Sequence, residues 1–303
     1  MLKLTGIMPA LLTPFDKEGE VNLTVLRELV DFHLASGVSG FYILGSTGEG
    51  LLLSEAERRL VAETVIAQVK GRAPVVVHVG ALTTRLACDL AAHAESAGAD
   101  ATSSIPPIYY HVGVEGVKQH YQAIAAASSL PFYIYNIPGT TGVDVTVDIV
   151  QDLMVRLPTL HGIKYTSYDF RRMRQIIELD GGRLNVMSGP DEMMVAAQAM
   201  GADGAIGTTQ NILPRLFAQI YEAFHAGDVA AAQEMQAKVN WVVNLFLQLP
   251  ASSAVKEIMR LIGFDCGSAR RPNLPLTAEQ KGWLREGLEE IGFFQFADVP
   301  GAD

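Results

Sequence analysis

Residues 84–105, TRLACDLAAHAESAGADATSSI, contain one complete structural unit and are the best guide to the fold. Apolar residues recur there at the helical period, which predicts a helix over Thr84–Ala97. Gly98 then supplies the left-handed turn that commonly ends a helix, and a short β-rich run follows at Ala101–Ile105. The same kind of small-residue turn precedes two further β-rich runs, so the unit repeats along the chain.

Eight β-rich runs alternate with helical stretches in this chain. Strands that alternate with helices imply parallel pairing through βαβ crossovers. The predicted strands are Ile7–Leu12, Gly40–Leu44, Val75–Val79, Ala101–Ile105, Phe132–Tyr135, Gly162–Tyr165, Asn185–Ser188 and Gly204–Gly207. The helices predicted between them include Leu23–Ser36, Glu55–Val69, Thr84–Ala97 and Glu115–Ser128.

Eight such units predict an α/β fold, a closed (β/α)8 TIM barrel over residues 1–225. A doubly wound open sheet is the alternative, but it usually has fewer strands, and no GxGxxG turn follows the first strand. Residues 226–303 are expected to form a C-terminal helical extension packed on the barrel, because no flexible linker precedes them. Helices are expected from residue 213 onward at Leu213–Ala226, Asp228–Leu247, Ser252–Leu261 and Ala278–Glu290.

Composition excludes several classes of protein. The chain is 49% hydrophobic and 18% charged, too apolar for disorder, and its net charge of −10 disfavours nucleic-acid partners. No apolar run is long enough for a membrane helix, and no signal peptide is predicted. Two isolated cysteines, Cys88 and Cys266, indicate reduced thiols and a cytoplasmic protein. The seven histidines are scattered without metal-ligand spacing, so no metal is expected.

In a barrel of this kind the active site lies at the C-terminal ends of the strands. Lys164 is the only one of eight lysines in a predicted strand. A lysine that points into the barrel loses hydration, which favours the neutral amine, and a neutral amine can attack a ketone to form a Schiff base. A lysine that faces outward or forms a salt bridge is the competing interpretation.

Other strand ends carry polar groups that suit such chemistry. Tyr135 ends the preceding strand and could shuttle a proton, or it could be a buried tyrosine with a satisfied hydroxyl. Ser46 and Thr47, in the Gly45–Glu49 turn, could hold a carboxylate with their hydroxyls and backbone N–H groups. The alternative is a capped turn before the helix that begins near Ser54, where Ser54 and Glu57 form a capping box.

The later strand ends also offer hydrogen-bonding groups. Asp191 and Glu192 follow the seventh strand and could accept hydrogen bonds from several substrate hydroxyls. Helix N-capping is the alternative for Asp191, but it leaves Glu192 unexplained. Tyr109 and Tyr110 follow the fourth strand and could line the pocket, a subunit contact or simply the surface.

With these residues in place, the sequence resembles the pyruvate-dependent class I aldolases of the N-acetylneuraminate lyase and dihydrodipicolinate synthase superfamily. The likeness covers about residues 6–277, and its motifs in this order are highly specific. The matching pieces are Pro9-x-x-x-x-Pro14-Phe15, Gly45-Ser46-Thr47-Gly48-Glu49, Tyr135-Asn136-Ile137-Pro138, Gly162-Ile163-Lys164 and Gly201-Ala202-Asp203-Gly204-x-Ile206-Gly207.

The resemblance implies a role for each of these residues. Lys164 would form the Schiff base with the substrate keto group, so that no cofactor is needed, and Tyr135 would transfer protons. Ser46 and Thr47 would hold the pyruvate carboxylate. Tyr109 or Tyr110 would complete a hydroxyl relay, contributed in related enzymes by a neighbouring subunit. The family is commonly a homotetramer, a dimer of dimers, and its substrates are small keto acids and sugar acids.

The resemblance also favours one branch of the superfamily. Synthases carry an arginine soon after Tyr-Asn-x-Pro, and here residues 139–142 are Gly-Thr-Thr-Gly. Sialic-acid lyases carry Gly-x-Asp-Glu, a hydroxyl after strand eight and a threonine two residues past the lysine. The matching substrate-binding candidates are Thr166, Gly189, Asp191, Glu192 and Thr208. Two departures, Gln210 and Tyr168, would reshape the sugar end of the pocket.

The expected activity is therefore a Schiff-base lyase that cleaves N-acetylneuraminate to pyruvate and N-acetylmannosamine. A 2-keto-3-deoxy-sugar-acid aldolase or dehydratase is the first alternative, and 4-hydroxy-tetrahydrodipicolinate synthase is the second. A catalytically silent keto-acid sensor is the alternative outside enzymes. It would require the loss of Lys164 or Tyr135, and the sequence has both.

Overall fold

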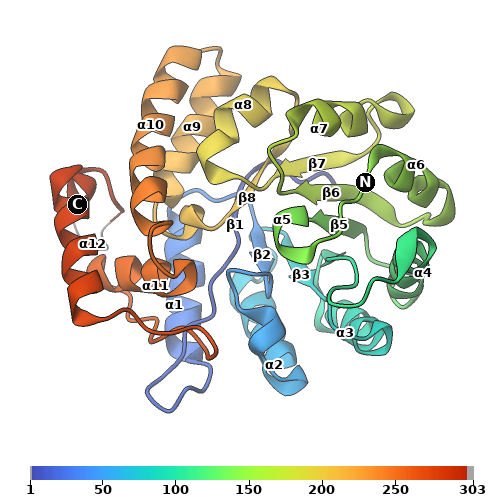
Figure 1. The fold of residues 1–303 in the computed structure, drawn as a ribbon, viewed down its shortest axis with the longest axis horizontal. Coiled ribbons are helices and arrows are strands. Elements are labelled where there is room, and N and C mark those ends of the chain that lie inside the picture. Colours follow the sequence, from blue (N-terminus) through green and yellow to red (C-terminus); the bar gives the residue numbers. More distant parts are fainter. Residues whose placement is uncertain (1, 299–303) are drawn as a thin grey trace.

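The repeated unit of the sequence builds a barrel of parallel strands with helices around it (Figure 1). The computed structural model describes residues 2–298. The strands are β1 (Gly6–Pro9), β2 (Phe41–Ile43), β3 (Val75–His78), β4 (Ala101–Ser104), β5 (Phe132–Asn136), β6 (Leu160–Tyr165), β7 (Asn185–Ser188) and β8 (Gly204–Gly207). The strand order is β1-β8-β7-β6-β5-β4-β3-β2, and every pair is parallel. The predicted TIM barrel is confirmed.

Helices follow the strands as the periodicity predicts. They are α1 (Leu23–Ala35), α2 (Glu55–Val69), α3 (Thr84–Ala97), α4 (Gly113–Ala126), α5 (Pro138–Thr141), α6 (Val147–Arg156), α7 (Phe170–Ile177), α8 (Met194–Ala199), α9 (Pro214–His225), α10 (Val229–Phe246), α11 (Ala251–Leu261) and α12 (Ala278–Glu290). The capping box at Ser54 and Glu57 is present at the start of α2. Gly98 has φ +88° and ends α3, as expected for a left-handed cap.

The barrel closes where β1 meets β2. Ala10 and Tyr42 form a single parallel bridge, and the Leu11 N–H donates to the Tyr42 carbonyl at 2.9 Å. The first strand is therefore shorter than predicted. Pro9 has no N–H to donate, and beyond it the pairing continues only through this bridge and the Ala10 N–H, which donates to the Gly207 carbonyl at 2.9 Å.

Alternate residues of each strand enter two different cores. Outward-facing residues such as Ile163 and Tyr165 pack with the surrounding helices in the larger cluster. Inward-facing residues such as Tyr135 and Met187 form a smaller cluster inside the barrel. Lys164 lies between two outward-facing residues on β6, so its side chain points into the barrel.

Helices α10, α11 and α12 lie to one side of the barrel (Figure 1). Gln236 of α10 donates to the Asp191 carbonyl at 3.0 Å and accepts from the Val195 N–H at 3.1 Å, so this region holds the turn after β7. The domain boundary expected after residue 225 coincides with the end of α9, but it stays a prediction. In the described part of the chain, no helix is both long and apolar enough to cross a membrane.

Candidate active site

Lys164 and Tyr135 are neighbours across two adjacent strands. The register of β5 and β6 places them side by side, and both side chains are buried inside the barrel. The Lys164 amine lies 4.3 Å from the centre of the Tyr135 ring and 4.4 Å from the centre of the Tyr42 ring. Within residues 2–298 no carboxylate forms an ion pair with this amine. The outward-facing interpretation of Lys164 is therefore wrong.

Tyr42 and His78, which the sequence did not single out for catalysis, pack against the pair formed by Lys164 and Tyr135. Burial raises the pKa of Tyr42 well above its ordinary value, and its hydroxyl donates to the Ser103 hydroxyl at 3.1 Å. Burial lowers the pKa of His78 to about 3, so the imidazole is neutral. Its Nε2 accepts from the Ile105 N–H at 3.3 Å, which leaves the hydrogen on Nδ1, 3.1 Å from the Leu44 carbonyl. For Tyr42, the alternation of inward-facing and outward-facing residues along its strand could have indicated that its side chain faces the barrel interior.

The predicted carboxylate turn lies beside the end of β8. The Thr47 hydroxyl is 2.7 Å from the Thr208 hydroxyl, which joins the second and eighth strand ends. Ser46 is exposed, and Ser46, Thr47 and Thr208 line one cavity of about 140 Å³. A larger cavity of about 490 Å³ adjoins it and shares Thr208 and Ala251 with it.

The larger cavity contains the other predicted substrate-binding residues. Thr166, Gly189, Asp191, Glu192 and Thr208 all line it. A Cβ on Gly189 would lie 1.9 Å from the Thr166 hydroxyl oxygen, so only glycine leaves that hydroxyl room. Among the described residues, this buried hydroxyl has no hydrogen-bond partner, so it is available to a ligand.

Asp191 is held by the chain itself. Its carboxylate accepts from the Thr209 N–H at 2.7 Å, from the Thr209 hydroxyl at 2.5 Å and from the Gln210 amide at 3.3 Å. The N-capping interpretation is wrong, since Asp191 begins the 3-10 helix Asp191–Met193 and caps no backbone N–H of it. Burial raises the pKa of Asp191 to about 6, although these donors oppose the rise. Gln210 therefore acts on the pocket through Asp191, and it does not line the cavity.

Glu192 faces a residue from the loop after β6. The Tyr168 hydroxyl donates to the Glu192 carboxylate, and this hydrogen bond is the main cause that raises the pKa of Tyr168 to about 12. Both side chains line the larger cavity. Tyr168 therefore occupies one oxygen of a carboxylate that a hydroxylated ligand would use.

Tyr109 and Tyr110 lie apart from this group. They are 84% and 73% exposed, and their rings stack edge to face with centroids 4.9 Å apart. Neither lines either cavity. Tyr109 also has φ +71°, an unfavourable backbone conformation for a tyrosine. Within a single chain, the structure does not bring these phenols to the buried lysine.

No group of three or more His, Cys, Asp or Glu side chains in residues 2–298 is arranged to hold a metal ion. Both cysteines are free, and Cys266 is buried.

Known proteins and a family model match nearly the whole chain. A family model described as the dihydrodipicolinate synthetase family matches residues 3–291. An N-acetylneuraminate lyase of Citrobacter koseri is 39% identical over 295 residues, covering 95% of this chain and 99% of that protein.

Solved structures extend the likeness to the fold. The N-acetylneuraminate lyase of Proteus mirabilis superposes with a TM-score of 0.91 at 32% identity, covering 96% of this chain and 100% of its own. A dihydrodipicolinate synthase of Bacillus anthracis superposes with a TM-score of 0.91 at 30% identity, covering 95% and 99%. The chain belongs to the dihydrodipicolinate synthetase family.

Proposed function

We propose that this protein is a class I aldehyde-lyase that cleaves N-acetylneuraminate to pyruvate and N-acetylmannosamine. The observation that carries the proposal is the buried Lys164 amine, which lies between two phenol rings without a carboxylate partner in the described chain. Similarity to lyases of that name over nearly the full length supports the choice of substrate.

The reaction begins with the carboxylate of the substrate on Ser46 and Thr47. The Lys164 amine attacks C2, and the carbinolamine loses water to give an iminium ion. Removal of the C4 hydroxyl proton then breaks the C3–C4 bond, and the electron pair moves into the iminium. The products of this step are N-acetylmannosamine and an enamine of pyruvate. Protonation at C3 and hydrolysis release pyruvate and the free amine.

Proton transfer falls to Tyr135, because its ring lies against the amine. Glu192, Thr166 and Thr208 bind the hydroxylated tail in the 490 Å³ cavity. Asp191 supports this wall through the hydrogen bonds that it accepts from Thr209, and its raised pKa leaves part of the carboxyl protonated near pH 6.

Several related expectations stay predictions. Tyr109 or Tyr110 joins the hydroxyl relay from a neighbouring subunit of a homotetramer, for which their exposure leaves them free. No cofactor or metal is required, because the covalent intermediate on Lys164 supplies the electron sink. The enzyme acts in the cytoplasm on small-molecule substrates, without a membrane or nucleic acid.

A second candidate is a 2-keto-3-deoxy-sugar-acid aldolase or dehydratase that uses the same iminium ion. Tyr168 favours it, since the phenol occupies the Glu192 carboxylate that a longer tail would need. The synthase alternative has less support. Within residues 2–298, no lysine or arginine lines the 490 Å³ cavity to bind the carboxylate of a second substrate.

The test is to incubate the protein separately with N-acetylneuraminate and 2-keto-3-deoxygluconate and to follow pyruvate with a coupled dehydrogenase. Fast release from N-acetylneuraminate alone is expected. Release only from the deoxygluconate would move the protein to the sugar-acid aldolases. No release from either compound would contradict both the lyase and the sugar-acid aldolase, and it would favour a dehydratase, a synthase or a sensor.

A further inference from the structure

Glu49 ends the predicted carboxylate turn and has no role in the chemistry above. Its side chain is 1% exposed, and its backbone has φ +54°, in the left-handed region that favours glycine. The turn also packs tightly on the barrel, because a Cβ on Gly50 would lie 1.9 Å from the Leu44 carbonyl oxygen. A buried carboxylate on a strained backbone requires strong interactions to hold it.

Those interactions come from the C-terminal region of the chain. The Lys256 ammonium of α11 lies 2.8 Å from Glu49 Oε1, and only 3% of the lysine side chain is exposed. The Arg270 N–H donates to Oε2 at 2.7 Å, and the Asn273 amide donates to the same oxygen at 3.2 Å. All three partners lie more than 200 residues after Glu49 in the sequence.

Lys256 is itself held in a defined place. Its ammonium lies 3.3 Å from the Ser268 carbonyl oxygen and 4.0 Å from the centre of the Phe15 ring. Burial lowers the pKa of Lys256, and Glu49 opposes that change. Each of these two buried charges therefore offsets part of the desolvation cost of the other.

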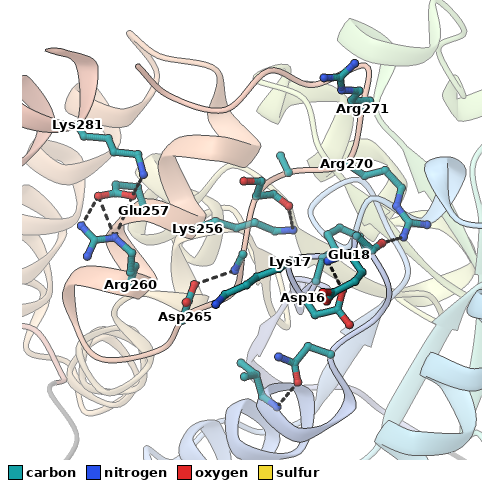
Figure 2. Close-up of a pocket in the computed structure, with 17 residues that line it drawn as sticks. Asp16, Lys17, Glu18, Lys256, Glu257, Arg260, Asp265, Arg270, Arg271 and Lys281 are labelled. Carbon is teal, nitrogen blue, oxygen red and sulfur yellow. Dashed lines mark hydrogen bonds and ion pairs between the residues drawn. The ribbon is translucent and has the colours of Figure 1, made fainter. Parts of the chain in front are cut away.

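Lys256 lies between two cavities of the protein. It lines the 140 Å³ cavity together with Ser46 and Thr47, and it also lines an outer cavity of about 880 Å³. Figure 2 shows Lys256 in this outer cavity, apart from the cluster of Glu257, Arg260 and Lys281. That cluster is paired internally, with Arg260 and Lys281 both bound to Glu257.

From this arrangement we infer that Glu49 and Lys256 are positioning residues. The ion pair between them clamps the Ser46–Thr47 turn to α11, so that the C-terminal extension sets the geometry of carboxylate binding. Glu49 lies two residues after Thr47, and a shift of the clamp therefore moves the two hydroxyls that receive the keto acid. The inference rests on the proposed function, because it assigns pyruvate to this turn.

The test measures pyruvate binding separately from the chemistry of Lys164. Each protein is incubated with increasing pyruvate and reduced with borohydride, and the fraction of trapped protein is read by mass spectrometry. The concentration for half-maximal trapping reports carboxylate binding, whereas maximal trapping reports formation of the iminium ion. Circular dichroism and thermal unfolding check that each variant is folded.

Two variants weaken the clamp to different extents. Glu49→Gln/Lys256→Met removes both charges together, so that no unpaired buried charge remains. We expect half-maximal trapping to require about tenfold more pyruvate, because the hydroxyls are misplaced. Asn273→Ala removes one hydrogen bond and should raise that concentration by about threefold. Maximal trapping should stay near the wild-type level in both.

Arg260→Met is the matched control. It removes a cation from the same helix and the same outer cavity, but Arg260 binds Glu257 and not the turn. Half-maximal trapping should be unchanged. Wild-type half-saturation in the folded double variant would overturn the inference. If that variant does not fold, wild-type half-saturation in Asn273→Ala would overturn it. Absence of trapping in the wild-type protein would instead refute the proposed function.

Discussion

Replacement of Asp191 by asparagine tests the electrostatics of the site through protein stability. Burial raises the pKa of the Asp191 carboxyl from 3.8 to about 6 in the folded protein. The substituted amide keeps an oxygen that can accept from the Thr209 N–H and hydroxyl. Its NH2 group can face Gln210 Oε1, which has no hydrogen-bond partner in the described part of the chain. The change therefore removes the charge while retaining the hydrogen bonds.

The sign of the effect follows from proton linkage. The folded protein binds this proton more tightly than the unfolded chain, so Asp191 lowers the free energy of unfolding as the pH rises from 3.8 through 6. With these two pKa values, the wild-type protein loses about 1.4 kcal/mol between pH 5 and pH 8 through this group, and about 3 kcal/mol over the full range. The Asp191→Asn variant does not have this loss.

Urea denaturation at one protein concentration, repeated from pH 5 to pH 8, measures the difference. The advantage of Asp191→Asn over wild type should grow by about 1.4 kcal/mol across that range. Asp152→Asn is the control, because a hydrogen bond from Lys118 lowers the pKa of the Asp152 carboxyl below 3.8, so its titration is complete below pH 5 and its difference from wild type should stay constant from pH 5 to pH 8. If the difference in free energy of unfolding between Asp191→Asn and wild type stays constant or shrinks as the pH rises, burial does not raise the pKa of this carboxyl.

Three other substitutions test the remaining parts of the site. Lys164→Ala should abolish borohydride trapping and pyruvate release, and normal turnover would eliminate the Schiff-base mechanism. Tyr168→Phe frees the oxygen of Glu192 that the phenol occupies. The ratio of kcat/KM for N-acetylneuraminate to kcat/KM for 2-keto-3-deoxygluconate should rise by up to about tenfold. A fall in this ratio would show that the phenol itself binds the tail. In Gly207→Ala the new Cβ would lie 1.6 Å from Asp191 Oδ1. Thermal unfolding should show a loss of about 3 kcal/mol or more, and an unchanged midpoint would contradict the close packing.

Local pattern was sufficient to predict the repeated unit of the fold. Hydrophobic periodicity and glycine turns depend on neighbours within a few residues, so α2, α3 and β7 begin and end where the sequence predicts. Residue type was also sufficient for Lys164. The sequence singles it out as the one lysine in a predicted strand, and the structure places it inside the barrel, whereas its catalytic role stays a prediction.

Partner choice at the strand ends required the folded chain. Asp191 was expected to cap a helix or to bind substrate. Its carboxylate accepts hydrogen bonds from Thr209 and Gln210, which excludes the cap, and substrate binding stays a prediction. Tyr168 was expected to reshape the pocket, and its actual contact is Glu192, 24 residues away. These donors and acceptors belong to short side chains on loops. No periodicity in the sequence specifies which of them form hydrogen bonds with each other.

The longest-range contacts were the least visible in the sequence. Lys256 lies in a predicted helix and was not singled out, although Met259, three residues later on the same helix, indicates a buried face. It pairs with Glu49 because α11 of the extension packs beside the turn after β2. Periodicity identifies which faces of helices and strands are buried, since that information is local. The ion pair depends on where two distant segments come to lie in space, and burial then makes it strong because little water remains to compete for either charge.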